Sequence, residues 1–154
     1  MNPHDATAVL VRHQLLSFAD RPTLLERLAS FGGDLPAAAE TLGLNREQVL
    51  ESLAQETLRH APRVKLSRTV HDPAALVHVS AGEAWDHVVL PLEVEADGTL
   101  VCCTTRETLI TSLEFLYQKL ELPFRVVLSD IGPLEQYIAE QYHYEGIEIE
   151  AEAA

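Results

Sequence analysis

The sequence has few cysteines and no long apolar run. Among its 154 residues there are two cysteines, and they are the neighbours Cys102 and Cys103. Neighbouring side chains of a strand point to opposite faces, so this pair is poorly placed to bridge and a disulfide framework is excluded. No apolar stretch approaches the roughly 20 residues of a membrane-spanning helix, and the N-terminus lacks the order of a signal peptide. We therefore expect a soluble, cytoplasmic protein.

Basic residues are scarce. Eleven Lys and Arg stand against 24 Asp and Glu, for a formal net charge of -13. The excess is uneven, because residues 1–78 hold eight basic and nine acidic residues whereas residues 79–154 hold three and fifteen. Affinity for a phosphate backbone comes from Lys and Arg displacing counterions, so this charge opposes nucleic-acid binding. A hydrophobic fraction of 47% is usual for globular domains and argues against wholesale disorder.

The first half of the chain has the signals of short helices. Asp34 is placed to cap a short helical segment that ends at Gly43. Asn45 with Gln48 three residues later forms a capping box for a longer helix, and Pro62 marks its end. The spacing predicts a helical subdomain over residues 1–62.

The second half changes to strand periodicity. Residues 88–95 and 100–104 are predicted strands, and Asp97-Gly98 between them favours a tight hairpin turn whose two central positions need positive φ. A helix, a third strand over residues 124–128 and a last helix follow. The helix has one predicted apolar face, made of Leu109, Ile110, Leu113, Leu116, Tyr117 and Leu120.

These patterns predict an α+β fold, with an N-terminal helical bundle followed by a small β-β-α-β-α subdomain. We place a basic connector at residues 63–80 and the β-β-α-β-α subdomain at residues 81–146. The acidic tail, residues 147–154, is expected to fray or to pair at a sheet edge.

Residues 84–142 resemble the N-terminal domain of type II secretion and type IV pilus assembly ATPases of bacteria. The similar elements are the strand Val88-Val89-Leu90-Pro91-Leu92-Glu93-Val94, the turn and strand from Asp97 to Val101, the helix with Leu113-Glu114-Phe115-Leu116, the strand at 124–128 and the closing helix to Tyr142. The resemblance implies a protein-interaction module that docks a motor onto a secretion or pilus platform protein, in the cytoplasm, with recruitment to the inner membrane through that partner.

The resemblance implies no catalysis by this stretch, since the family hydrolyses ATP in a separate domain. The glycines of the sequence never form the G-x-x-x-x-G-K-[ST] spacing that cradles phosphates. We therefore expect a non-enzymatic chain. A free-standing regulatory partner that mimics the docking domain is a variant of this hypothesis.

Some members of the family bind cyclic di-GMP, which makes a sensor over residues 42–68 an alternative function. Residues 42–55 resemble the end of one such binding motif, with Gly43, Val49, Leu53 and Gln55 roughly in place. The opening Arg and Gly of the motif are absent and the spacing slips by one.

Four cations form the candidate site for a partner or ligand. They are Arg59, Arg63, Lys65 and Arg68, and no acid interrupts the chain between Thr57 and Thr69. Guanidinium and ammonium groups are the usual contacts for phosphates and carboxylates. The alternative is a solvated connector that neutralises the acidic half of its own molecule.

Other functional classes have weaker support. Residues 34–55 fit a helix-turn-helix, but its exposed candidates would set carboxylates near DNA phosphates; they are Glu47, Gln48, Glu51, Ser52, Gln55 and Glu56. The seven histidines show no zinc-binding spacing, so no metal is expected. The cysteines are expected in the core.

Overall fold

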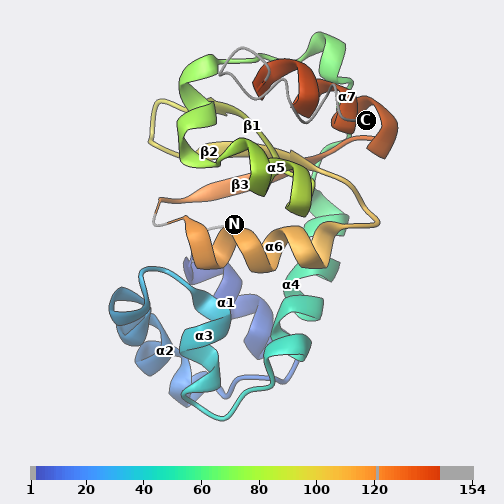
Figure 1. Cartoon of the computed structure of the whole chain (residues 1–154). Helices are drawn as coiled ribbons and strands as arrows, with labels where there is room; N and C mark the ends of the chain where they lie inside the picture. The colour runs from blue at the N-terminus through green and yellow to red at the C-terminus, as the bar shows by residue number, and fades with distance from the viewer. Residues whose placement is uncertain (1–2, 121, 143–154) are drawn as a thin grey trace. The chain divides into compact units, whose positions relative to one another are not determined.

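The computed structural model describes residues 3–120 and 122–142 (Figure 1). The predicted acidic tail at 147–154 and the last four residues of the predicted subdomain lie outside these ranges. The chain forms two compact units that are discontinuous in sequence. Of the described residues, the first unit comprises 3–60 with 113–120 and 122–124, and the second unit comprises 61–112 with 125–142. The predicted boundaries at 62, 80 and 146 stay a prediction.

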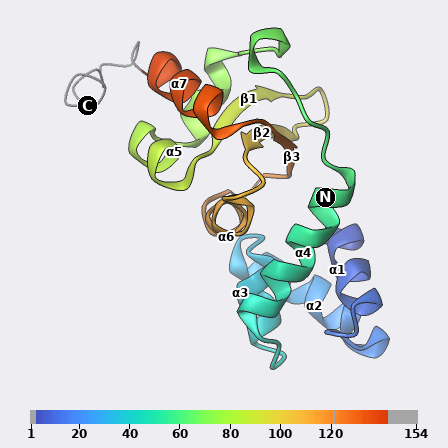
Figure 2. The same cartoon turned by 90° about the vertical axis from the view of Figure 1, so that its right-hand side faces the viewer.

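The first unit is helical. It contains α1 (Pro3–Arg12), η1 (Phe18–Asp20), α2 (Arg21–Leu28), η2 (Ala29–Phe31), α3 (Leu35–Glu40) and α4 (Arg46–His60), where η is a short 3-10 helix. α1 packs on α2 and α4, and α3 packs on α2 and α4 (Figure 2). The core is aliphatic and includes the fully buried Leu10, Leu24, Leu35, Val49 and Leu53.

The predicted cap at Asp34 is confirmed, and the structure shows one hydrogen bond of the capping box predicted at Asn45. The Asp34 carboxylate accepts the Ala37 N–H at 3.2 Å, which starts α3. Gly43 has φ +85°, the left-handed conformation that glycine adopts without steric cost, and it separates α3 from α4. The Asn45 side chain accepts the Gln48 N–H at 3.1 Å at the start of α4. α4 ends at His60, two residues before Pro62.

The second unit is a small sheet with helices around it. Its mixed sheet has the order β1 (Leu90–Val94), β2 (Leu100–Thr104), β3 (Phe124–Leu128). The other elements are η3 (Leu66–Arg68), η4 (Pro73–His78), α5 (Ala81–His87) and α7 (Ile131–Tyr142). α6 (Leu109–Lys119) continues from this unit into the first. The predicted α+β class is confirmed.

The burial of β2 and the backbone pairing of β1 describe this sheet. Every residue of β2 is buried, so both faces of the strand are covered and the thiols of Cys102 and Cys103 lie in the core, as predicted. β1 pairs antiparallel with β2, with an irregularity between Pro91 and Glu93. The Leu92 carbonyl between them accepts the Asp72 N–H at 2.8 Å, which ties the incoming chain to the sheet.

The predicted hairpin is confirmed, but the predicted turn type is wrong. The Glu95 carbonyl accepts the Gly98 N–H at 2.9 Å, so Ala96 and Asp97 are the central residues of the turn. Only Gly98 has positive φ in this turn, at +90°. The extra loop residue lets Asp97 keep negative φ, and its carboxylate accepts the Thr99 N–H at 2.9 Å.

Two further sequence predictions need correction. The first strand begins at Leu90 instead of residue 88, because Val88 has φ +55° and ends α5 in the left-handed region. Ile110 does not belong to the buried face of α6, since its side chain is 48% exposed. Ile110 lies about 100° around the helix from Leu109, at the border of the buried face.

Candidate functional site

Three of the four predicted cations lie on one exposed segment of the second unit, residues 63–68, which we name the cationic strip. Arg63 forms a parallel bridge with Leu128 of β3. The Val64 N–H donates to the Leu128 carbonyl at 2.8 Å, and the Leu128 N–H donates to the Pro62 carbonyl at 2.9 Å. The strip therefore begins as an extended segment beside β3.

The strip is anchored at its far end as well. Leu66 is buried, and its carbonyl accepts the Thr69 hydroxyl at 3.0 Å. His71 Nε2 lies 2.6 Å from the same carbonyl, and the His71 ring stacks on Tyr137 of α7 at 4.9 Å between centroids. Residues 63–80, which we predicted as a basic connector, thus lie in the second unit and include η3.

The charges of the strip face solvent. Arg63, Lys65 and Arg68 are exposed, and the Arg63 guanidinium lies 2.9 Å from the Asp130 carboxylate. Both side chains of that pair are at least 70% exposed, so the pair adds little stability. Within the described ranges, Lys65 and Arg68 form no ion pair.

Arg59, the fourth predicted cation, lies near the end of α4 in the first unit and is exposed. Its neighbour His60 lies 3.0 Å from the carboxylate of Glu56. The structure thus brings together Arg63, Lys65 and Arg68 and assigns Arg59 to a different unit.

The predicted exposed face of α4 needs a correction. Ser52 and Glu56 are buried, at 4% and 6% exposure. The Ser52 hydroxyl bonds to His13 Nδ1, and the Glu56 carboxylate accepts from Arg12 at 3.1 Å. These two positions of α4 point toward the packed α1 side, so they are not available to a nucleic acid.

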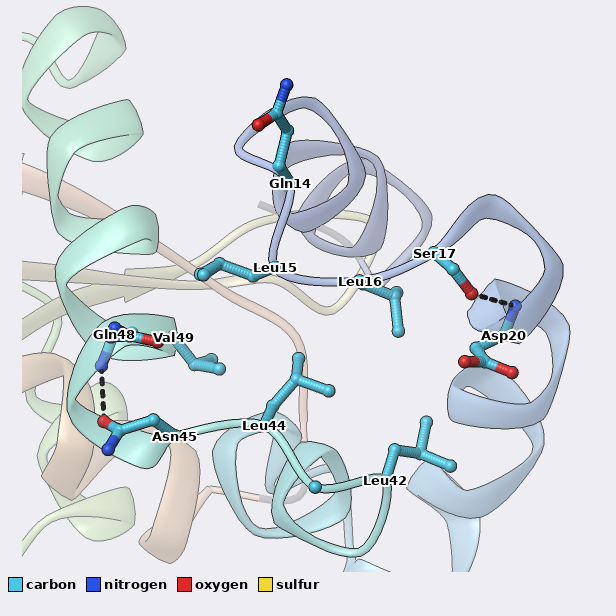
Figure 3. Close-up of a pocket in the computed structure, with 11 residues that line it drawn as sticks. Gln14, Leu15, Leu16, Ser17, Asp20, Leu42, Leu44, Asn45, Gln48 and Val49 are labelled. Carbon is cyan, nitrogen blue, oxygen red and sulfur yellow. Dashed lines mark hydrogen bonds between the residues drawn. The ribbon is translucent and has the colours of Figure 1, made fainter.

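A pocket of about 370 Å³ lies in the first unit between two helix turns (Figure 3). Each turn has a left-handed residue, Gln14 at φ +63° and Gly43 at φ +85°. Each also has a capping side chain, since Ser17 accepts the Asp20 N–H at 3.2 Å and Asn45 accepts that of Gln48. The pocket is lined by Gln14, Leu15, Leu16, Ser17, Asp20, Leu42, Gly43, Leu44, Asn45, Gln48 and Val49.

The pocket includes part of the predicted nucleotide motif. Gly43 and Val49 line it, whereas Leu53 is buried in the core and Gln55 lines a separate, more open pocket with His13. Asp20 is the one ionisable residue in its lining, so the pocket presents a negative charge to a ligand.

Sequence reasoning missed two participants in these sites. Asp130 pairs with Arg63 across 67 residues, and no local pattern identifies such a partner. Gln14 adopts a left-handed conformation that glycine usually fills, and the capping Ser17 after it was the available signal. Within residues 3–120 and 122–142, no group of three or more His, Cys, Asp and Glu could hold a metal ion.

Nor does any described helix have the length and apolar character needed to cross a membrane.

Comparison with known proteins gives matches among solved structures alone. No family model matches the chain, and no curated protein matches it. A structure of MshE with cyclic di-GMP is 24% identical, covers 89% of this chain and 98% of its own, and has a TM-score of 0.49. The N-terminal domain of XpsE is 18% identical, covers 92% of this chain and 96% of its own, and has a TM-score of 0.45.

Proposed function

We propose that this chain is a non-enzymatic docking module that binds a secretion or pilus platform protein on the cytoplasmic side of the inner membrane. The single observation that supports this function is the cationic strip. It is a run of exposed basic side chains in a strongly acidic chain, and hydrogen bonds to β3 hold its backbone. A fixed array of cations loses less conformational entropy on binding than a free connector does.

The experiment is affinity capture with the whole chain as bait, followed by mass spectrometry of the captured proteins. Recovery of a secretion or pilus platform protein is the expected result. A second bait has Arg59, Arg63, Lys65 and Arg68 changed to Ala, and it should recover less of that protein. A charge-preserving bait with Arg63→Lys and Arg68→Lys is the matched control.

The outcome that removes the docking function is capture of no platform protein by the unchanged chain. Measurable ATP turnover by the purified chain would also contradict it, because the sequence has no phosphate-binding loop with its lysine. Equal recovery by all baits would leave docking standing and move the interface away from these cations.

Cyclic di-GMP sensing is a second candidate, favoured by the pocket at Gly43 and Val49 (Figure 3). This nucleotide is named with the similar structure of MshE. The pocket has amide side chains suited to hydrogen bonding with a base, but its lining contains the Asp20 carboxylate and no Lys or Arg. Two ligand phosphates would meet a negative charge there.

Isothermal titration with cyclic di-GMP tests this candidate. Binding that strengthens in an Asp20→Asn variant would support a nucleotide at this pocket, because the substitution removes the repulsion and keeps the side-chain shape. Absence of heat at high ligand concentration in both proteins would remove the candidate.

A further inference from the structure

The spacing of the cationic side chains in the strip indicates which shape of ligand they can bind. Arg63 lies in a bridge with β3, and Lys65 has extended dihedrals of φ -101° and ψ 117°. Side chains two residues apart in extended chain share a face, about 6.6 Å apart. Arg63 and Lys65 therefore point to one side, and the half-buried Val64 points to the other.

The outer edge of this segment also has backbone groups that face away from β3. The Pro62 carbonyl and the Val64 N–H both bond to Leu128. Arg63 lies between Pro62 and Val64. In a parallel ladder, a residue whose two neighbours bond to the adjacent strand has its own N–H and carbonyl on the edge that faces away from that strand. The N–H and carbonyl of Arg63 thus face the side on which a further extended chain could align.

Apolar side chains border the cations. Val70, two residues after Arg68, is 59% exposed, and Ile131, next to the Asp130 that pairs with Arg63, is 42% exposed. Cations flanked by exposed aliphatic side chains suit a ligand with both carboxylates and apolar residues.

We propose that the cationic strip binds an extended acidic segment of the partner protein, in which carboxylate and apolar residues alternate. This inference rests on the proposed docking function and names the chemistry of the partner at that site. Alternate carboxylates of the segment pair with Arg63 and Lys65, and Arg68 extends the contact. Apolar residues of the segment cover Val70 and Ile131.

A membrane is the less suitable ligand. Clusters that bind anionic lipid usually hold four to eight Lys and Arg, and the strip holds three. The net charge of -13 repels an anionic bilayer over its whole area, whereas a single bound peptide meets the cations locally.

Asp130 has a distinct role in this proposal. Its carboxylate occupies Arg63 at 2.9 Å, so it competes with the incoming segment for that guanidinium. Removing its charge should strengthen binding, whereas a residue that only supports the fold would weaken binding when changed. Asparagine also caps helices well, so Asp130→Asn keeps the start of α7 intact.

The experiment measures fluorescence anisotropy of a labelled peptide of alternating Glu and Val against the full chain. The triple variant Arg63→Ala, Lys65→Ala, Arg68→Ala should bind about tenfold more weakly, and Asp130→Asn about two- to fivefold more tightly. Arg106→Ala, which removes an exposed cation of the same unit outside the strip, should leave the affinity unchanged. Circular dichroism of each variant confirms that it is folded.

Four results would overturn the proposal. The first is equal affinity of the unchanged chain and the triple variant. The second is equal affinity for a peptide of the same composition whose glutamates are contiguous. The third is binding to vesicles of phosphatidylcholine and phosphatidylglycerol with no binding to the peptide. A platform protein captured equally by all baits, with no peptide binding, would overturn this inference and leave the docking function intact.

Discussion

Charged side chains of the first unit that lie in or near its core are paired between helices. The Arg46 guanidinium lies 3.0 Å from Glu40, 3.1 Å from Glu114 and 3.9 Å from Asp34. Burial opposes its charge, but the hydrogen bonds to Glu114 and Glu40 raise the pKa of Arg46 above its usual value. The first residue of α4 is thereby joined to α3 and α6.

Glu56 should make the stability of the chain depend on acid. Burial disfavours its charge, but the hydrogen bond from Arg12, followed by attraction to Arg12 and His60, lowers the pKa of Glu56 below its ordinary value. A group with a lower pKa in the folded state stabilises the fold above its unfolded pKa, and this contribution is lost as pH falls through the folded pKa. We expect Glu56→Gln to destabilise the chain at pH 7 and to flatten the loss of stability below about pH 4.5.

Urea unfolding at a series of pH values measures this effect. Glu51→Gln, an exposed carboxylate on the same helix, is the matched control and should follow the unchanged chain. A Glu56→Gln variant with the same acid dependence as the control would show that Glu56 does not contribute.

The two cysteines should be unreactive in the folded chain. Burial raises the pKa of the Cys102 thiol. Burial also raises the pKa of the Cys103 thiol to about 11, although its hydrogen bond with Ser129 acts in the opposite direction. The thiolate is the reactive form, so both burial and protonation slow modification. We expect a chromogenic disulfide reagent at pH 8 to label neither thiol in buffer and both in denaturing urea. Rapid labelling of Cys102→Ser, which retains Cys103, in buffer would show that this thiol is accessible.

At the scale of elements, backbone conformation decides what each glycine contributes. Gly43 between α3 and α4 and Gly82 in the first turn of α5 both have open space where a Cβ would be. They differ in φ, which is +85° at Gly43 and outside the left-handed region at Gly82. Since an added Cβ would meet no neighbouring atom at either position, a difference between the two alanine variants would reflect backbone strain and not crowding.

Substitution by alanine should have opposite effects at these two positions. Gly43→Ala should lower the free energy of unfolding by about 1 to 2 kcal/mol, since an L-residue is strained at positive φ. Gly82→Ala should raise it by about 0.4 to 1 kcal/mol, because alanine reduces the entropy of the unfolded chain. Chemical denaturation of both variants measures the two changes, and the same sign at both sites would refute the argument.

For the whole molecule, the net charge of -13 destabilises the compact folded state. Repulsion among excess carboxylates destabilises the folded state, and salt screens it. We expect the midpoint of thermal unfolding to rise by a few degrees between about 50 mM and about 500 mM NaCl.

A less charged variant is the control for this salt effect. Asp86→Asn with Glu107→Gln removes two exposed negative charges of the second unit. Its midpoint should be higher at low salt and should rise less with added NaCl. A midpoint that falls with salt in the unchanged chain would mean that favourable ion pairs, such as those of Arg46, outweigh the repulsion.

Local sequence signals determined most of the elements. Asp34 and Asn45 each accept the backbone N–H of the residue three positions later, so their helices start where the sequence predicts. The α+β class, the order of the strands along the chain and the buried cysteines follow from periodicities of two and three to four residues. The basic run that became the candidate site is also visible in the sequence.

Contacts between distant residues decided the rest. The turn at Ala96-Asp97 depends on how the two strands align, and the burial of Ser52 and Glu56 depends on α1 packing against α4. The strip begins beside β3 because Val64 hydrogen-bonds to Leu128, and Asp130 pairs with Arg63 across 67 residues. The local sequence pattern does not predict such pairings, because their energy depends on the fold that brings the two partners together.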